Sequence, residues 1–177
     1  MWLLQHPVHK DARGTFREWF RKDELFIQTG INFEVVQTNN SLSKKATIRG
    51  VHYSSAKGGQ AKLVTCIAGS IFDAVIDIRP NSPTFKKWVG IELNANSGNC
   101  LLISGGLGHA FQALENETAV SYLLNASYQP KFEFEINPLD QDLNIDWPLK
   151  DFILSKKDLS SPSLNERLQN SQLPLCK

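Results

Sequence analysis

The middle of the chain reads as a series of short β-strands separated by turn residues. Each run is rich in β-branched and aromatic side chains, several alternate apolar and polar positions, and each is bounded by Gly, Asn, Ser or Pro. The runs are 61–69, 70–78, 86–94, 100–105 and 118–124. Many short strands at roughly ten-residue spacing are typical of a sandwich or barrel. The pattern therefore predicts a mainly β fold.

Helical patterns are confined to the two ends of the chain. Residues 16–30 carry helix-favouring residues around Lys22 to Phe26 and stop at Gly30, which predicts one short helix. The polar tail, 161–177, is expected to hold another helix or to fray. No repeat, low-complexity tract or linker-like Pro/Gly/Ser run interrupts the chain. We therefore expect a single domain over residues 1–177.

Charge and cysteine content narrow the class of protein. Lysine and arginine total 19 against 18 acidic residues, so the molecule lacks the overall field that concentrates nucleic acid or anionic membrane. Any anionic ligand must be held by local cations. Cys66, Cys100 and Cys176 are widely spaced, without a CxxC pair, which indicates neither a disulfide framework nor a zinc knuckle. The apolar start is too short for a signal peptide or a spanning helix, so we expect a soluble, cytoplasmic protein.

Two histidines lie in strand-like segments that contain glycine. His52 lies in IRGVHYS and His109 in SGGLGHAF, and a barrel interior can bring two such distant positions into one cavity. The alternative is that each is a hydrogen-bonded interior histidine. A metal site in such a barrel generally needs a paired His-x-His followed by a carboxylate. RGVHYSSAKGG supplies one histidine and no nearby acid, so metal binding is not expected.

Other polar residues allow a functional and a structural interpretation. Lys62 begins an apolar strand, where an inward ammonium is costly unless it meets an anion or carbonyl oxygen, and an outward, solvated lysine is the alternative. Tyr122 and Tyr128 are either core phenols or proton donors. Arg13 and Arg49 each precede a glycine, which suits phosphate binding, although surface arginine explains each alone. Single aspartates are common in turns and caps, and the chain has Asp73, Asp77 and Asp158. These residues by themselves predict no reaction.

An ordered set of motifs resembles the dTDP-4-dehydrorhamnose 3,5-epimerase family. The motifs are DARGTFREWF, QTNNSLSKKATIRGVHY, QAKLVTCIAGSIFDAVIDIRPNSPTF, GLGHAFQAL, SYLLNASYQPKFE, IDWP and LSKKDLSSPSL. They run from Asp11 to Leu164, nearly the whole chain. The resemblance implies a double-stranded β-helix, the cupin or jelly-roll barrel, with a few short helices. It also implies a homodimer, no metal or organic cofactor, and a nucleotide-linked 4-keto-6-deoxyhexose as substrate.

The resemblance also implies roles for individual residues. The 4-keto group of such a sugar acidifies the hydrogens on C3 and C5, so a base can form an enolate that an acid reprotonates from the opposite face. His52 matches the family's base, and Asp158 matches the carboxylate that orients it. Lys62 matches the cation beside the enolate oxygen. Tyr122 matches the phenolic acid, and Tyr128 falls where the family has a second tyrosine.

The remaining matches concern the nucleotide diphosphate. The family's binding positions fall on Arg13, Glu18, Gln37, Asn39, Arg49, His109, Glu133 and Lys157. Two departures stand out: Ser54 replaces a glutamine after the HY pair, and Pro138 replaces a tryptophan. That tryptophan is an expected stacking platform for the base, so its absence leaves the identity of the base open.

The sequence thus leads to the hypothesis that the protein is an epimerase of deoxysugar biosynthesis. Such an enzyme is an isomerase, and it would invert C3, C5 or both carbons of the sugar. One alternative is a barrel isomerase that moves the keto group between C3 and C4. A second is a non-catalytic sugar-nucleotide-binding or scaffold protein, which the joint presence of His52, Lys62, Tyr122 and Asp158 disfavours. A third is a metal-dependent cupin dioxygenase, which the spacing of potential ligands disfavours.

Overall fold

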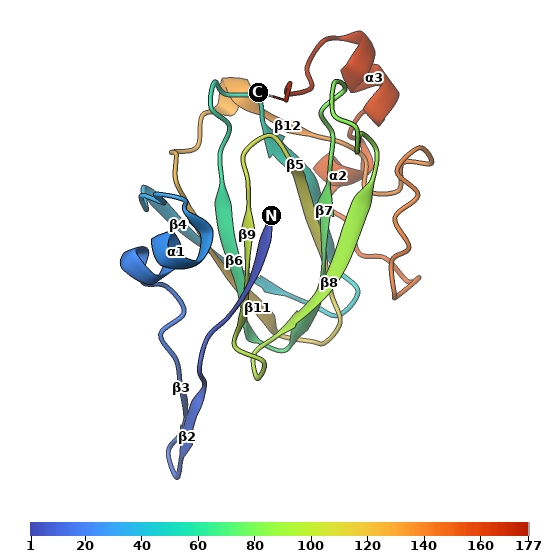
Figure 1. Cartoon of the computed structure of the whole chain (residues 1–177). Coiled ribbons are helices and arrows are strands. Elements are labelled where there is room, and N and C mark those ends of the chain that lie inside the picture. Colours follow the sequence, from blue (N-terminus) through green and yellow to red (C-terminus); the bar gives the residue numbers. More distant parts are fainter. Residues whose placement is uncertain (177) are drawn as a thin grey trace.

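The computed structural model of the protein describes residues 1–176 and consists mainly of β-strands (Figure 1). The elements in chain order are β1 (Trp2–Gln5), β2 (His9–Asp11), β3 (Gly14–Phe16), α1 (Lys22–Thr29), β4 (Gln37–Ser43), β5 (Ile48–Ser54), β6 (Lys62–Ala68), β7 (Ser70–Ile76), β8 (Trp88–Asn94), β9 (Asn99–Ile103), β10 (Gly108–Ala113), β11 (Thr118–Leu124), η1 (Pro130–Phe132), β12 (Glu133–Glu135), α2 (Lys156–Leu159) and α3 (Leu164–Gln169). The predicted runs correspond to β6, β7, β8, β9 and β11, and each is confirmed as a strand.

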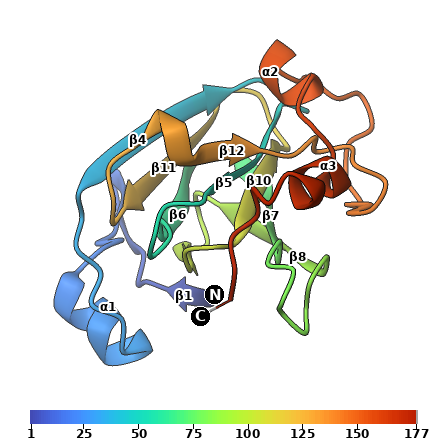
Figure 2. The same ribbon diagram turned by 90° about the horizontal axis from the view of Figure 1, so that it is seen from above.

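Two five-stranded antiparallel sheets face each other and form the barrel (Figure 2). The first sheet has the order β1-β9-β6-β11-β4, and the second has the order β12-β5-β10-β7-β8. Side chains from both inner faces meet in one core, which includes Val64 and Val120 of the first sheet and Ile71 and Phe111 of the second. The predicted mainly β barrel, a double-stranded β-helix with a few short helices, is confirmed.

Helices α1 and α3 cover the outer faces of the two sheets (Figures 1 and 2). On the first sheet Leu25 of α1 packs with Leu63 and Leu102. On the second, Leu164 of α3 and Trp147 pack with residues of β5, β7 and β10. The apolar residues on the outer face of each sheet are thereby shielded from water, as those on the inner faces are by the core.

The two helix predictions are confirmed. The helix expected around Lys22 to Phe26 is α1, and Gly30 ends it in the left-handed conformation, with φ of 71° and its N–H donating to the Phe26 carbonyl at 2.8 Å. The polar tail forms the short helix α3, which begins with a capping box between Ser163 and Glu166.

The pattern of the sequence did not predict the hairpin formed by β2 and β3. All the residues of both strands are exposed, and the hairpin projects away from the barrel (Figure 1). Short polar strands without a buried face leave no alternation to detect. Among residues 1–176, no helix has the length and apolar character needed to cross a membrane.

Candidate active site

His52 is joined to the short helix α2 by a hydrogen bond. Its Nε2 lies 2.8 Å from Oδ1 of Asp158, whose side chain is buried, while 45% of the His52 side chain is exposed. Ser155, the N-cap of α2, donates its hydroxyl to Oδ2 of the same carboxylate at 2.9 Å. Because an ionised carboxylate only accepts hydrogen bonds, Nε2 carries the proton and Nδ1 keeps a lone pair. The contact thus fixes the ring and leaves its basic nitrogen available.

The Asp158 carboxyl group stays ionised in this arrangement. Burial acts to raise its pKa, but the hydrogen bond and charge of His52, the Ser155 hydroxyl and the charge of Lys157 together lower the pKa below its usual value. A negative charge beside an imidazole stabilises the imidazolium that forms when the ring takes a proton. The pair is therefore suited to general-base chemistry.

His52 points into the barrel together with His109. The two residues are directly paired between β5 and β10, and cross-strand partners lie on the same face of a sheet. Phe111, two residues along β10 from His109, belongs to the core between the sheets. The two histidines, which the sequence suggested could share one cavity, are thus cross-strand neighbours.

Lys62 and Tyr122 lie on the inner face of the opposite sheet. Val64 belongs to the core between the sheets, and residues two apart on a strand share a face, so Lys62 also points inward. Tyr122 packs against the same core and is paired in register with Val64. Both side chains therefore face the sheet that carries His52.

The Lys62 ammonium lies near two carboxylates. Burial lowers the pKa of Lys62 below the usual value for lysine, and the charges of Glu133 and Asp73 offset only part of that effect. Within the part of the chain that the structure describes, the ammonium forms no hydrogen bond or ion pair, and Oε1 of Glu133 is buried without a partner. The Lys62 ammonium and the Glu133 carboxylate are therefore both available to bind a polar ligand.

Asp73 is a member of this cluster to which the sequence assigned no role. Its side chain is fully buried, and both of its carboxylate oxygens lie 3.0 Å from Nε2 of His109. The sequence pattern of this strand does contain a feature that could have identified Asp73. Ile71 and Val75 on either side face the core, and a carboxylate on that face requires a polar partner.

The predicted residues of β4 form a polar row beside Tyr122. Asn39 is paired in register with Tyr122, and Gln37 donates to Oδ1 of Asn39 at 3.0 Å. The Gln37 carbonyl oxygen in turn accepts from the backbone N–H of Tyr128 at 2.8 Å, and Tyr128 is 56% exposed. The contact ties the segment that follows β11 to the open edge of the first sheet.

Arg49 spans from the second sheet to the first. Its guanidinium donates from Nε to the Ser43 hydroxyl at 3.1 Å and from Nη2 to the Leu42 carbonyl at 3.2 Å. Arg49 is an exposed cation, so it can also reach an anion in solution.

Lys157, next to Asp158, forms an ion pair with Glu135 at 3.1 Å. Glu135 lies opposite His52 in the pairing of β12 with β5.

Arg13 and Glu18 are not brought to this cluster within one chain. Arg13 is at the tip of the projecting hairpin, where it pairs with Asp11 at 2.6 Å and 91% of its side chain is exposed. Glu18 follows the hairpin and lies 4.0 Å from Arg21. Among residues 1–176, no hydrogen bond or ion pair joins either side chain to a residue of the inner faces, and the hairpin leads away from the barrel (Figure 1).

The two residues that depart from the family motifs, Ser54 and Pro138, lie in different surroundings. Ser54 is buried and is paired in register with Glu133, so it borders the interior near Lys62. Pro138 is also buried, and its carbonyl accepts a hydrogen bond from the indole N–H of Trp147 at 2.9 Å. Position 138 thus takes part in the packing of the C-terminal segment on the second sheet. Among residues 1–176, no group of three or more His, Cys, Asp or Glu residues is arranged to hold a metal ion.

Comparison with known proteins places the chain in a family. The family model described as dTDP-4-dehydrorhamnose 3,5-epimerase matches residues 1–166. The dTDP-4-dehydrorhamnose 3,5-epimerase of Mycolicibacterium smegmatis is 40% identical over 174 residues, which are 98% of this chain and 86% of that protein.

Two solved structures have the same fold throughout. ChmJ, a 3'-monoepimerase from Streptomyces bikiniensis in complex with dTDP-quinovose, has a TM-score of 0.93 and 36% identity, covering 98% of this chain and 88% of its own. The dTDP-6-deoxy-D-glucose-3,5-epimerase RmlC of Legionella pneumophila, in complex with dTDP-4-keto-L-rhamnose, has a TM-score of 0.92 and 37% identity, covering 99% and 93%. The chain therefore belongs to the dTDP-4-dehydrorhamnose 3,5-epimerase family and is, as the sequence predicted, an isomerase.

Proposed function

We propose that the protein inverts C3, C5 or both of a nucleotide-linked 4-keto-6-deoxyhexose through an enolate. The observation that carries the proposal is the hydrogen bond between His52 and Asp158 on one inner face, opposite the inward ammonium of Lys62 on the other. A base and a cation facing each other are what enolate formation beside a ketone requires. Relatives named as acting on dTDP-linked deoxysugars support the substrate class.

The chemistry assigns one task to each inward group. Nδ1 of His52 takes the proton from C3 or C5, and the electrons of the broken C–H bond move into the carbonyl, forming an enolate oxygen. The Lys62 ammonium stabilises that oxygen, and Asp158 stabilises the new imidazolium. Tyr122 then donates its phenolic proton to the same carbon from the opposite face, and solvent restores both proton carriers. No organic cofactor and no metal enter these steps.

The nucleotide diphosphate is assigned to the edge of the barrel near β4. Arg49 can offer its remaining guanidinium N–H groups to phosphate there, and Gln37 and Asn39 offer amide groups on the same edge. His109, Tyr128, Glu133 and Lys157 complete the proposed binding set. Arg13 and Glu18 can join it only from a second copy of the chain, since their hairpin projects away from its own barrel. We therefore keep a homodimer as part of the proposal.

The proposed setting is the reducing cytoplasm, with residues 1–177 acting as one catalytic domain. Cys66, Cys100 and Cys176 are all free thiols, and the first two are buried in the barrel. Free cysteines are typical of proteins that work in reducing compartments.

The test is incubation of dTDP-4-keto-6-deoxyglucose in D2O with NMR of the sugar. Wild-type enzyme is expected to place deuterium at C3, C5 or both and to form the corresponding epimers, with no loss of rate in EDTA. His52→Ala is expected to lower exchange by roughly 10²–10⁴-fold, while the matched control His9→Ala, at an exposed histidine, keeps the wild-type rate. A product with the keto group moved to C3, or activity that depends on a divalent ion, would overturn the proposal.

A further inference from the structure

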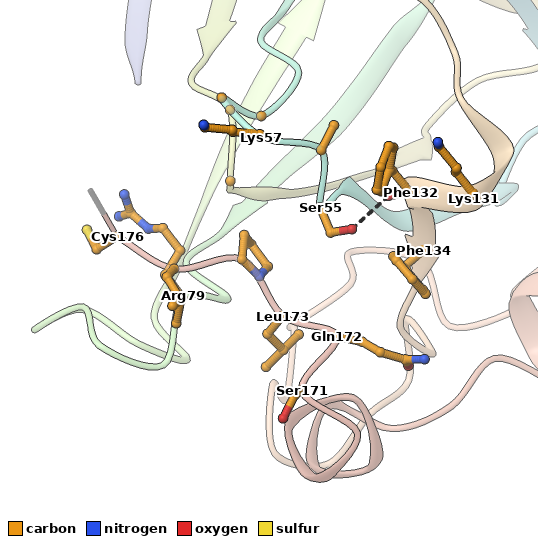
Figure 3. A pocket seen from close by; sticks show the side chains of 17 residues that line it. Ser55, Lys57, Arg79, Lys131, Phe132, Phe134, Ser171, Gln172, Leu173 and Cys176 are labelled. Carbon is orange, nitrogen blue, oxygen red and sulfur yellow. Dashed lines mark hydrogen bonds between the residues drawn. The ribbon is translucent and has the colours of Figure 1, made fainter.

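A pocket of about 770 Å³ lies at one end of the barrel, outside the candidate active site. Its walls are the β5–β6 loop (55–59), the turn at Gly105 and Gly106, the segment of η1 and β12, and the C-terminal segment 171–176 (Figure 3). A pocket of this volume accommodates a ligand of nucleotide size.

This pocket lies on the other side of β12 from the catalytic cluster. Glu133 is paired with Ser54 and lies near Lys62, whereas Phe134, the next residue along the strand, lines the pocket and stacks on Tyr53. Consecutive residues of a strand point to opposite faces. None of the residues proposed for catalysis or substrate binding lines the pocket.

The charged side chains that line the pocket are all cationic. Lys57, Arg79 and Lys131 line it, and no aspartate or glutamate does. Arg79 is held in place by Asp77, which accepts from its Nε at 2.8 Å and its Nη2 at 2.7 Å, so its own charge is largely balanced. Among residues 1–176, the ammonium of Lys57 has no hydrogen bond or ion pair, and that of Lys131 contacts only the Phe132 ring, at 4.8 Å. The pocket therefore carries an excess of positive charge.

Two glycine-bearing loops pack closely at the pocket. They touch through Gly59 and Gly105, where an added Cβ would lie 2.7 and 2.8 Å from the opposite backbone. Gly106 follows and is buried, and a Cβ there would lie 3.5 Å from Cδ of Arg79. The absence of side chains at these positions keeps the space beside Arg79 open.

The C-terminal segment is a fixed wall of this pocket. The Asn81 side chain donates to the Cys176 carbonyl at 3.1 Å and accepts from the Cys176 N–H at 2.7 Å, and the Gln172 carbonyl accepts from the Tyr53 hydroxyl at 3.3 Å. Figure 3 shows Lys57 and Arg79 on one side of the pocket and Lys131 beside Phe132 on the other. Cations thus flank the pocket on both sides, and the aromatic ring lies on the side of Lys131.

We propose that this pocket is a second binding site, for a nucleotide. Its phosphate groups bind between Lys57, Lys131 and Arg79, and its base lies against Phe132, from which the Lys131 ammonium turns to the phosphate. Such a site is separate from the catalytic cluster, because none of the residues assigned to the reaction lines it.

Calorimetric titration with ADP, inorganic pyrophosphate and adenosine tests the proposal. The double variant Lys57→Ala/Lys131→Ala is expected to bind ADP about tenfold or more weakly than wild type, through the loss of charge-assisted contacts. The matched control Lys44→Ala/Lys45→Ala removes the same charge from an exposed turn and should leave ADP affinity unchanged. Both double variants should retain wild-type turnover, and Arg49→Ala should still bind ADP in this pocket.

Pyrophosphate and adenosine report separately on the phosphate and the base parts of the proposed site. Pyrophosphate is expected to bind with the same dependence on Lys57 and Lys131 but more weakly than ADP, and adenosine more weakly still. Equal ADP affinity in wild type and Lys57→Ala/Lys131→Ala overturns the proposal. So does loss of all ADP binding in Arg49→Ala, which would place the nucleotide in the catalytic site alone.

Discussion

His52 and Asp158 lie 106 residues apart in the chain, and their side chains meet at 2.8 Å between Nε2 and Oδ1. The carboxylate reaches the imidazole from α2, whose N-cap Ser155 donates a second hydrogen bond to it. A helix only four residues long therefore fixes the orientation and the tautomer of the proposed base.

Asp158→Asn tests this orientation. The amide keeps the size of the side chain but removes the charge that stabilises the imidazolium, so we expect kcat to fall by roughly 10²–10⁴-fold with a small change in KM. Steady-state kinetics on the 4-keto sugar gives both values. Asp151→Asn, at an exposed aspartate, serves as the control. A kcat near that of wild type in Asp158→Asn would remove the carboxylate from the reaction.

Lys62→Met tests the cation opposite His52. Methionine keeps much of the chain length but has no charge, so we expect turnover to fall by about 10²–10³-fold, as when an oxyanion donor is removed. The ammonium is costly to bury, because its pKa is lowered mainly by burial. The free energy of unfolding at neutral pH, measured in urea, should therefore not decrease. Unfolding of Lys62→Met at neutral pH would instead give Lys62 a structural role.

The same lysine sets the alkaline limit of activity. Since its pKa in the folded protein is below that of an ordinary lysine, the ammonium loses its proton as pH rises through that lowered value, and the rate should fall with it. The measurement is the pH profile of kcat in wild type and in Lys62→Met. An alkaline limb that persists unchanged in the variant would belong to another group.

Arg49→Ala tests the phosphate end of the site. A contact to the diphosphate acts equally in the ground state and the transition state, so we expect a higher KM with kcat nearly unchanged. Isothermal titration with dTDP should show the same loss of affinity. Arg21→Ala, at an exposed arginine next to α1, is the matched control. Unchanged dTDP affinity in Arg49→Ala would place this arginine outside the phosphate site.

The loop between β7 and β8 makes an acid-sensitive contribution to stability. Burial opposes ionisation of Asp77, but Arg79, Ser82 and Thr84 all donate to its carboxylate and hold its pKa well below the usual range. The stabilisation is therefore present above the unfolded pKa of about 3.9 and is lost as pH falls through the lower folded value.

We expect Asp77→Asn to cost about 2 kcal/mol or more at neutral pH and to flatten the decline of stability between neutral and acid pH. Urea unfolding at a series of pH values measures both effects. Asp146→Asn, whose side chain is 85% exposed, should behave like wild type. An equally steep acid decline in Asp77→Asn would assign it to other carboxylates.

The sequence predicted β6 and β7 because each is a short, mostly buried run rich in β-branched residues, which is a local feature. Gly30 marked the end of α1 because helix termination is also local. The pairing of Asp73 with His109 was not predictable in the same way. It depends on how β7 and β10 are aligned, and that register is set by contacts far apart in the chain.

The roles of the site residues came from the family motifs and not from periodicity. A lone histidine such as His52 has the same pattern whether it is a base or a core residue, and only the contact with Asp158 distinguishes the two. The hairpin carrying Arg13 left no signal, since none of its residues is buried.

In the proposed mechanism the base and the acid lie on opposite inner faces, His52 on β5 and Tyr122 on β11. Tyr122→Phe keeps the ring that packs in the core and removes the hydroxyl. Tyr128→Phe, at the exposed tyrosine of the proposed binding set, is compared with it and should still invert the sugar, because Tyr128 is assigned to binding and not to proton transfer. Both variants can be followed by NMR after incubation in D2O.

That single NMR measurement reads exchange and inversion together. We expect Tyr122→Phe to exchange the C3 or C5 hydrogen for deuterium with configuration largely retained and to form little epimer, because the proton returns from the side of His52. If Tyr122→Phe inverts the sugar at an undiminished rate, Tyr122 is not the acid and the proposed two-face mechanism is contradicted.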